Sequence, residues 1–162
     1  MKVKILLMLF IFCPLLGCDR YTKEQAVILL KGQEPLSLLN GIFSLTYYEN
    51  TGAMLSLGAN LPNELRFLIF TFIIGLVLTG GLFYVLVTPM GKYSFAVGLL
   101  ILAGGFGNLY DRALNDGRVV DFMLLQIGPL KTGVFNVADI AIMAGLLGFV
   151  FISSKWGKQF NR

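Results

Sequence analysis

Long runs of residues without charge dominate the chain and predict membrane-spanning helices. Three of these runs contain no charged side chain, except for Asp139 in the last of them. Each run approaches the roughly 20 residues that a helix needs to cross a bilayer. A fourth, shorter run follows Lys2 and Lys4, whose long side chains can extend it by reaching toward the headgroups. The pattern predicts one polytopic domain over residues 1–162, with spans at about 3–18, 67–87, 93–110 and 134–152.

The segments between these runs, residues 19–66 and 111–133, are more polar and predict structure on the outer membrane surface. Residues 22–30 favour a short amphipathic helix that Gly32 would end. Residues 42–48 are rich in β-branched and aromatic side chains and predict a strand, followed by a turn at residues 50–53 and a return strand at 55–57. We therefore expect a mainly α membrane protein, with four transmembrane helices and a small β-rich element on the outer surface.

Composition and charge placement agree with this interpretation and give an orientation. Hydrophobic residues make up 56% of the chain and charged residues only 14%, which is too little charge for a soluble domain. With four spans and a cytoplasmic amino terminus, the inner segments contain basic residues and no acidic ones, as the positive-inside rule requires. Both termini are then cytoplasmic. The net charge of +4 reflects this orientation and gives no reason to expect a nucleic-acid partner.

Asp139 is the candidate for chemistry, because a carboxylate within a span is costly unless it is paired, protonated or facing water. Asp121 stands in an apolar stretch on the same predicted side of the membrane. Two such carboxylates in a partly dry site would share one proton, which is the requirement of an aspartic protease. Their spacing alone does not show that they meet, and a structural role for Asp139 in helix packing stays open.

Other catalytic chemistries find little support in the sequence. The chain contains no histidine, which excludes Ser-His and Cys-His pairs and most zinc sites. Its two cysteines, Cys13 and Cys18, provide neither a disulfide framework nor a metal site. We therefore predict no metal and no organic cofactor.

Polar side chains gather near the two aspartates at helical spacing. Asn136 lies three residues before Asp139, and Asn108, Asp111 and Arg112 share a face at the outer end of the third span. These groups can support a carboxylate site or a substrate backbone. Two alternatives stay open: Asn108 as a helix-to-helix hydrogen bond, and Arg112 paired with Asp111 as an interface anchor.

Four motifs occur in an order that resembles lipoprotein signal peptidase (signal peptidase II). They are Asn50-Thr51-Gly52-Ala53, Gly107-Asn108-Leu109-Tyr110-Asp111-Arg112, Val119-Val120-Asp121-Phe122 and Phe135-Asn136-Val137-Ala138-Asp139. Asp19 and Lys23 are similar to that family's Asp-Gln-x-x-Lys element after the first span. Each motif is weak by itself, but the four in order with four spans are specific.

The resemblance implies an aspartic endopeptidase of the bacterial inner membrane, with its active site near the outer face. It implies cleavage of diacylglyceryl-modified prolipoproteins just before the lipidated cysteine, with membrane lipid as the other partner. Asp121 and Asp139 would be the catalytic pair. Support of the site or substrate is implied for Asn50, Gly52, Asn108, Arg112, Asn136, Asp19 and Lys23. We expect a monomer without a metal or cofactor.

The sequence also departs from the family pattern. Arg20 stands where the family usually has glutamine, Met54-Leu55 replaces Ala-Phe, and the loop at residues 113–120 is about one residue longer than usual. These differences leave the two aspartates in place. We expect them to affect the contacts of the loops and the preference for substrates.

Three alternatives follow from the same residues. Leu15-Leu16-Gly17-Cys18 resembles a lipoprotein signal with its acylated cysteine, in which case residues 1–17 would be removed. We favour retention of the first span, which Asp19 and Lys23 need in order to lie at the membrane surface. A proton-coupled transporter using Asp139, or an inactive lipid-anchored protein, would replace the enzyme if no lipidated precursor is cut.

Overall fold

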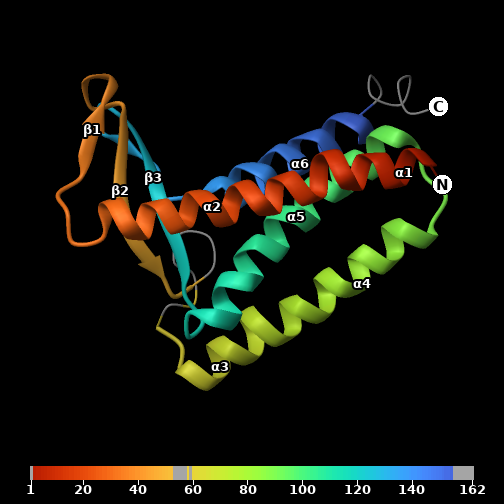
Figure 1. Ribbon diagram of the computed structural model, residues 1–162, viewed down its shortest axis with the longest axis horizontal. Helices are drawn as coiled ribbons and strands as arrows, with labels where there is room; N and C mark the ends of the chain where they lie inside the picture. Colours follow the sequence, from red (N-terminus) through yellow and green to blue (C-terminus); the bar gives the residue numbers. More distant parts are fainter. Residues whose placement is uncertain (1, 53–57, 59, 155–162) are drawn as a thin grey trace.

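The computed structural model describes residues 2–52, 58 and 60–154. It is mainly helical, with a small antiparallel sheet set across one end of the helices (Figure 1). The helical segments are α1 (Lys2–Leu7), η1 (Met8–Phe12), α2 (Cys13–Leu30), η2 (Leu39–Gly41), α3 (Asn63–Phe67), η4 (Leu68–Ile73), α4 (Ile74–Val87), α5 (Lys92–Leu114) and α6 (Val137–Ser153). The strands are β1 (Leu36–Leu38), β2 (Phe43–Asn50), β3 (Val119–Ile127) and β4 (Leu130–Lys131).

The first helix is longer than its apolar run predicts. Segments α1, η1 and α2 follow one another without a break from Lys2 to Leu30. The prediction of a separate short helix at residues 22–30 is therefore wrong, because that segment continues the first helix. A short π-helical stretch lies just before Pro14, which has no N–H to donate. Ion pairing of Arg20 with Glu24 at 2.8 Å supports the polar half of this helix.

Two helical segments in the described part of the chain are long and apolar enough to cross a membrane, Asn63–Val87 and Lys92–Leu114. They contain the predicted runs at 67–87 and 93–110. Segment α6 is also apolar but has only 17 residues. It begins at Val137 and not at 134, because Phe135 forms a β-bridge with Met123. Asp139 is consequently in the first turn of its helix, closer to the sheet than its place in the run predicts.

Close approach of α5 and α6 fixes the position of this first turn. A Cβ atom on Gly104 would lie 2.3 Å from the backbone oxygen of Ala138, a distance that no real side chain allows. On Gly145 it would lie 2.5 Å from the side chain of Ile101. Glycine at these positions lets the two backbones pack directly against each other.

At the end distant from the sheet, α4 and α5 pack through an apolar cluster. Phe95 and Leu99 are almost fully buried there, with Leu78, Val85 and Leu102 beside them. The Lys4 ammonium joins the first helix to this end, because it donates to the carbonyl oxygens of Val85, Leu86 and Thr88 at 2.7–2.9 Å. Towards the sheet α4 diverges from the first helix and from α6 (Figure 1).

The sheet has the strand order β1-β2-β3-β4, and all its neighbouring strands are antiparallel. Strand β2 includes most of the predicted strand at 42–48 and extends to Asn50. The sequence did not predict β3, its partner, although the pair aligns Tyr48 with Asp121. The return strand predicted at 55–57 lies outside the described residues. Ala26 of α2 packs under the sheet with Val120 and Phe122, which explains why the first helix continues this far.

Candidate active site

Asp121 lies on β3 with only 1% of its surface exposed. Each carboxylate oxygen accepts one amide hydrogen bond. Asn136 Nδ2 donates to Oδ1 at 2.6 Å, and Asn50 Nδ2 donates to Oδ2 at 3.1 Å. Strand pairing therefore places Asp121 between an asparagine from the neighbouring strand β2 and one from the start of α6.

Asp139 is held by the cap of α6. Asn136 is the N-cap, and its Oδ1 accepts from the Asp139 backbone N–H at 3.0 Å. In return, the Asn136 backbone N–H donates to Asp139 Oδ2 at 3.1 Å, which completes a reciprocal capping box. Asn108 Nδ2 of α5 donates to Asp139 Oδ1 at 2.9 Å. Two donors and the positive end of the helix dipole thus face a half-buried carboxylate.

Asn136 connects the two aspartates directly. Its side chain bonds Asp121 and its backbone bonds Asp139, while it is itself fully buried. The Asn136 side-chain amide also donates to Asn108 Oδ1 at 3.1 Å. Asn108, which itself donates to Asp139, is therefore held by Asn136 as well. The structure thus brings together the aspartates and three of the predicted supporting residues, Asn50, Asn108 and Asn136.

The surroundings of Asp121 favour its protonated form. Burial raises the pKa of Asp121 from 3.8 to about 7, and the charge of Asp139 contributes in the same direction. The hydrogen bonds from Asn50 and Asn136 and the charge of Lys23 oppose this rise in pKa. Near neutral pH a substantial fraction of Asp121 is therefore protonated.

Lys23 lies behind the pair with 1% of its surface exposed, and its ammonium uses its donors on three neighbours. It contacts Asp19 Oδ2 at 2.8 Å, Asp111 Oδ2 at 3.0 Å and Asn108 Oδ1 at 2.9 Å. Because an ammonium only donates, it fixes the orientation of the Asn108 amide, whose NH2 group must then face Asp139. Asp19 completes the link to α6 by accepting from the Ala138 N–H at 2.8 Å.

Arg112 and Gly52 form a separate contact beside the aspartates. Arg112 donates from a terminal nitrogen to the Gly52 carbonyl at 2.8 Å, and its guanidinium lies 5.8 Å from the Phe70 ring centroid. The Gly52 N–H donates to Asn50 Oδ1 at 3.0 Å. Arg112 Nε is buried and has no hydrogen-bond partner among the described residues.

Asp111 is part of the buried polar cluster, although the sequence analysis did not list it among the site residues. The alternative of a pair with Arg112 is not what the structure shows, because Asp111 accepts from Lys23 and from the Val120 N–H at 3.2 Å. This bond fixes the residue before Asp121. The sequence offered one signal for this contact. Asp19 and Lys23 are four residues apart and can pair on one helix face, and a buried lysine can pair with a second carboxylate such as Asp111. Within the described residues, no three acidic or cysteine side chains form a group that could hold a metal ion.

A family model described as signal peptidase (SPase) II matches residues 11–155. The chain belongs to the signal peptidase II family. It is 34% identical to the lipoprotein signal peptidase of Syntrophus aciditrophicus, over 93% of each protein. It is 36% identical to the lipoprotein signal peptidase of Chlorobium phaeovibrioides, over 84% of this chain and 83% of that one. The resemblance inferred from the four motifs is confirmed.

Solved structures agree at the level of the fold. A bacterial membrane enzyme structure obtained by the in meso method superimposes with a TM-score of 0.77 at 23% identity, over 96% of this chain and 94% of that one. A second such structure gives 0.71 at 22% identity, over 93% and 87%. This signal peptidase II family member is therefore a bacterial membrane protein with that fold.

Proposed function

We propose that this family member is an aspartic endopeptidase that removes signal peptides from diacylglyceryl-modified prolipoproteins, cutting before the lipidated cysteine. The observation that carries the proposal is the bridge through Asn136, whose side chain bonds Asp121 and whose backbone bonds Asp139. A shared-proton pair needs two carboxylates held at close range with different tendencies to ionise. Burial raises the pKa of Asp121, and Asn136 holds Asp139 close to it.

In the reaction we infer, Asp139 is the base and Asp121 the acid. Asp139 takes a proton from water as the water oxygen bonds to the scissile carbonyl carbon, and Asp121 gives its proton to the carbonyl oxygen. When the tetrahedral intermediate collapses, the C–N bond breaks and Asp139 passes its proton to the leaving nitrogen. Asp121 recovers a proton from the hydroxyl group that becomes the new carboxyl. The pair then returns to its starting state.

The other polar groups are assigned supporting roles. Asn50, Asn108 and Asn136 orient the two carboxylates, and Asp19 and Lys23 hold α2 and α5 behind them. Arg112 lies beside the aspartates and holds the Gly52 carbonyl through a terminal nitrogen. All these side chains come from one chain, so the site is complete in a monomer.

We infer four spans with both termini in the cytoplasm and the sheet on the outer surface. Lys4, at the amino-terminal end, and Lys92, the first residue of α5, lie at the same end of the bundle, opposite the sheet. Positive charge at that end favours the cytoplasmic side. With the sheet outside, the lipid of the substrate stays in the bilayer while the peptide bond beside it reaches Asp121 and Asp139 at the outer surface.

Cleavage of a defined precursor tests the proposal. Purified protein in lipid bilayers is given a diacylglyceryl-modified precursor peptide, and the products are identified by mass. We expect a single cut before the lipidated cysteine and no cut of the same peptide with an unmodified cysteine. Failure to cut, with transport that depends on Asp139 but not on Asp121, would support the transporter alternative instead.

A further inference from the structure

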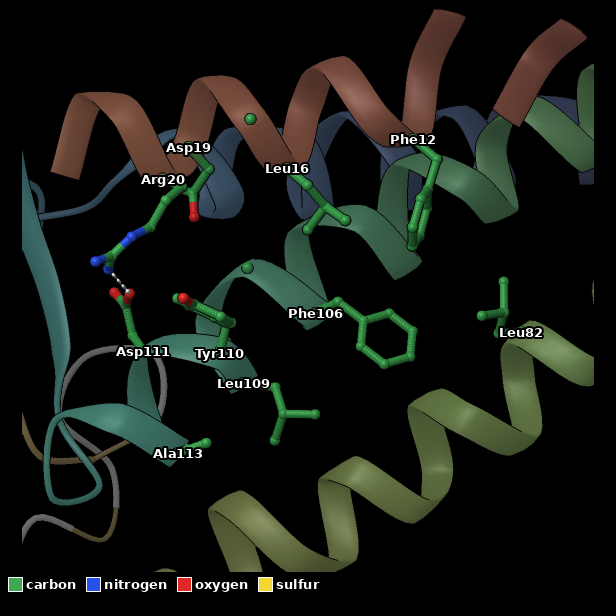
Figure 2. Close-up of a pocket in the computed structure, with 12 residues that line it drawn as sticks. Phe12, Leu16, Asp19, Arg20, Leu82, Phe106, Leu109, Tyr110, Asp111 and Ala113 are labelled. Atoms are coloured by element: carbon green, nitrogen blue, oxygen red, sulfur yellow. Dashed lines mark ion pairs between the residues drawn. The ribbon is translucent and has the colours of Figure 1, made fainter. Parts of the chain in front are cut away.

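A hollow between the helices, called the groove below, lies on the opposite side of α5 from Asp121 and Asp139. It has a volume of about 670 Å³ and lies between the first helix, α5 and α4 (Figure 2). Phe12 and Leu16 line it from the first helix, Phe106 and Leu109 from α5, and Leu82 from α4. Cavities that hold small organic ligands have volumes of roughly 300–1,000 Å³. The hollow is therefore large enough for a ligand of that size.

Its walls are apolar along the helices and polar only at the end near the sheet. There Arg20 and Tyr110 lie at the rim, with the Arg20 guanidinium carbon 5.1 Å from the Tyr110 ring centroid. Arg20 pairs with Glu24 at 2.8 Å and more distantly with Asp111 at 3.7 Å. These contacts use only part of a guanidinium that has five N–H donors. About two fifths of the Arg20 side chain and half of the Glu24 side chain are exposed.

We propose that this groove binds one phospholipid of the surrounding bilayer. One acyl chain lies along the apolar walls, the phosphate contacts Arg20, and the headgroup amine contacts Glu24. An arginine suits a phosphate because its N–H groups match the phosphate oxygens, and an exposed aromatic ring beside it is typical of the membrane interface. The neighbouring carboxylate of Glu24 favours a zwitterionic headgroup over an anionic one.

The charge pattern separates this occupant from the substrate of the proposed function. A diacylglyceryl group on cysteine has acyl chains but no phosphate, so it would leave the rim arginine unused. Asp19, Gly107 and Asp111 also line the hollow, whereas Asn108, Asp121 and Asp139 do not. The groove thus shares a wall with the polar cluster without opening onto the two aspartates.

Two matched glycine substitutions test the groove. Gly17 lines it and Gly80 does not, and a Cβ atom at either position meets no other atom within 4 Å. We expect native mass spectrometry to find about one bound dioleoylphosphatidylethanolamine on the wild type and on Gly80→Leu, and at least fivefold less on Gly17→Leu. Ala113→Phe, which fills the groove from α5, should reduce binding in the same way and covers the case in which Gly17→Leu fails to fold.

Lipids with matched chains test the headgroup contact. The wild type should bind dioleoylphosphatidylethanolamine at least fivefold more tightly than dioleoylglycerol, and Arg20→Gln should lose that preference while retaining the fold. Equal binding to Gly17→Leu, Ala113→Phe and Gly80→Leu would overturn the proposal, as would equal affinity of the wild type for the two lipids. Displacement of the phospholipid by a diacylglyceryl precursor, together with a raised KM in Gly17→Leu, would show a substrate subsite and also overturn it.

Discussion

Segment α5 is stabilised in two different ways along its length. At the end distant from the sheet it buries Phe95 and Leu99 in an apolar cluster, where stability grows with the area removed from water. At the sheet end it contributes Asn108 and Asp111 to a buried polar cluster, in which each donor has its acceptor. Apolar packing tolerates gradual change, whereas a polar cluster loses much of its stability when one partner is removed.

Neutralising one aspartate tests the chemistry at the polar end most strongly. We expect Asp121→Asn and Asp139→Asn each to lower the cleavage rate by at least about 1,000-fold, because neither amide can exchange a proton with water or substrate. Asp116→Asn is the matched control, since Asp116 is exposed in a turn, and its rate should equal that of the wild type. Near-normal cleavage by either dyad mutant, measured on folded protein, would refute the assignment.

The sequence predicted most of the helices, but it could not predict that Asp121 and Asp139 come together. Residues 67–87 and 93–110 form helices because their apolar side chains favour nothing else in a bilayer. The continuation of the first helix beyond residue 18 was missed because Asp19 and Lys23 read as surface residues, although they neutralise each other in the interior. The meeting of Asp121 with Asp139 depends on strand register and on the close approach at Gly104, which spacing does not encode.

Removing the buried lysine should show how costly an incomplete polar cluster is. Lys23→Met leaves Asp19 and Asp111 buried without their cation, so we expect a loss of about 3–5 kcal/mol in the free energy of unfolding. Lys31→Met removes an exposed, solvent-screened pair with Glu49 and should cost far less. Thermal unfolding in detergent measures both, and equal losses would contradict the distinction between the two sites.

One added methyl group at the helix contact tests packing without touching a charge. Gly104→Ala places a carbon against the Ala138 backbone and should destabilise the protein by about 1–3 kcal/mol. Gly80→Ala has open space and should be neutral or stabilising by up to about 1 kcal/mol, since alanine favours a helix. If unfolding temperatures of the two variants are the same, the tight contact between α5 and α6 is not formed in the protein.

The pH dependence should report the raised pKa of Asp121. Because the acid form of the pair is lost above about pH 7, the cleavage rate should fall about tenfold per pH unit there, and an acid limb should complete a bell that belongs to the pair. The stability contribution of a raised carboxyl pKa is complete below its unfolded value, about 3.9, and is lost as the pH rises through 7. The unfolding temperature should therefore decline between pH 5 and 8, less so in Asp121→Asn. A flat rate profile over this range would count against a dyad.

The smallest effect is expected at Cys18, which is exposed on the first helix. We expect the mature protein to keep residues 1–17 without an acyl chain, because Lys4 bonds the end of α4 and Phe12 packs edge-on against Phe106 at 6.0 Å. Cys18→Ser should leave both the intact mass of the chain, apart from the substituted atom, and the cleavage rate unchanged. A lipid-bearing protein that begins at Cys18 would show that it is itself a lipoprotein.

The order in which the chain is synthesised has a consequence for when this site can exist. Lys23 is made early, Asn50 follows on β2, and Asp139 arrives only with α6 near the carboxyl end. Asn136, which joins the carboxylates, belongs to the same late segment. A nascent chain that lacks α6 has Asp121 without Asp139 and without the Asn136 bridge, so the proposed catalytic pair does not yet exist. On the proposed mechanism, cleavage can therefore start only once α6 has entered the membrane and packed against α5.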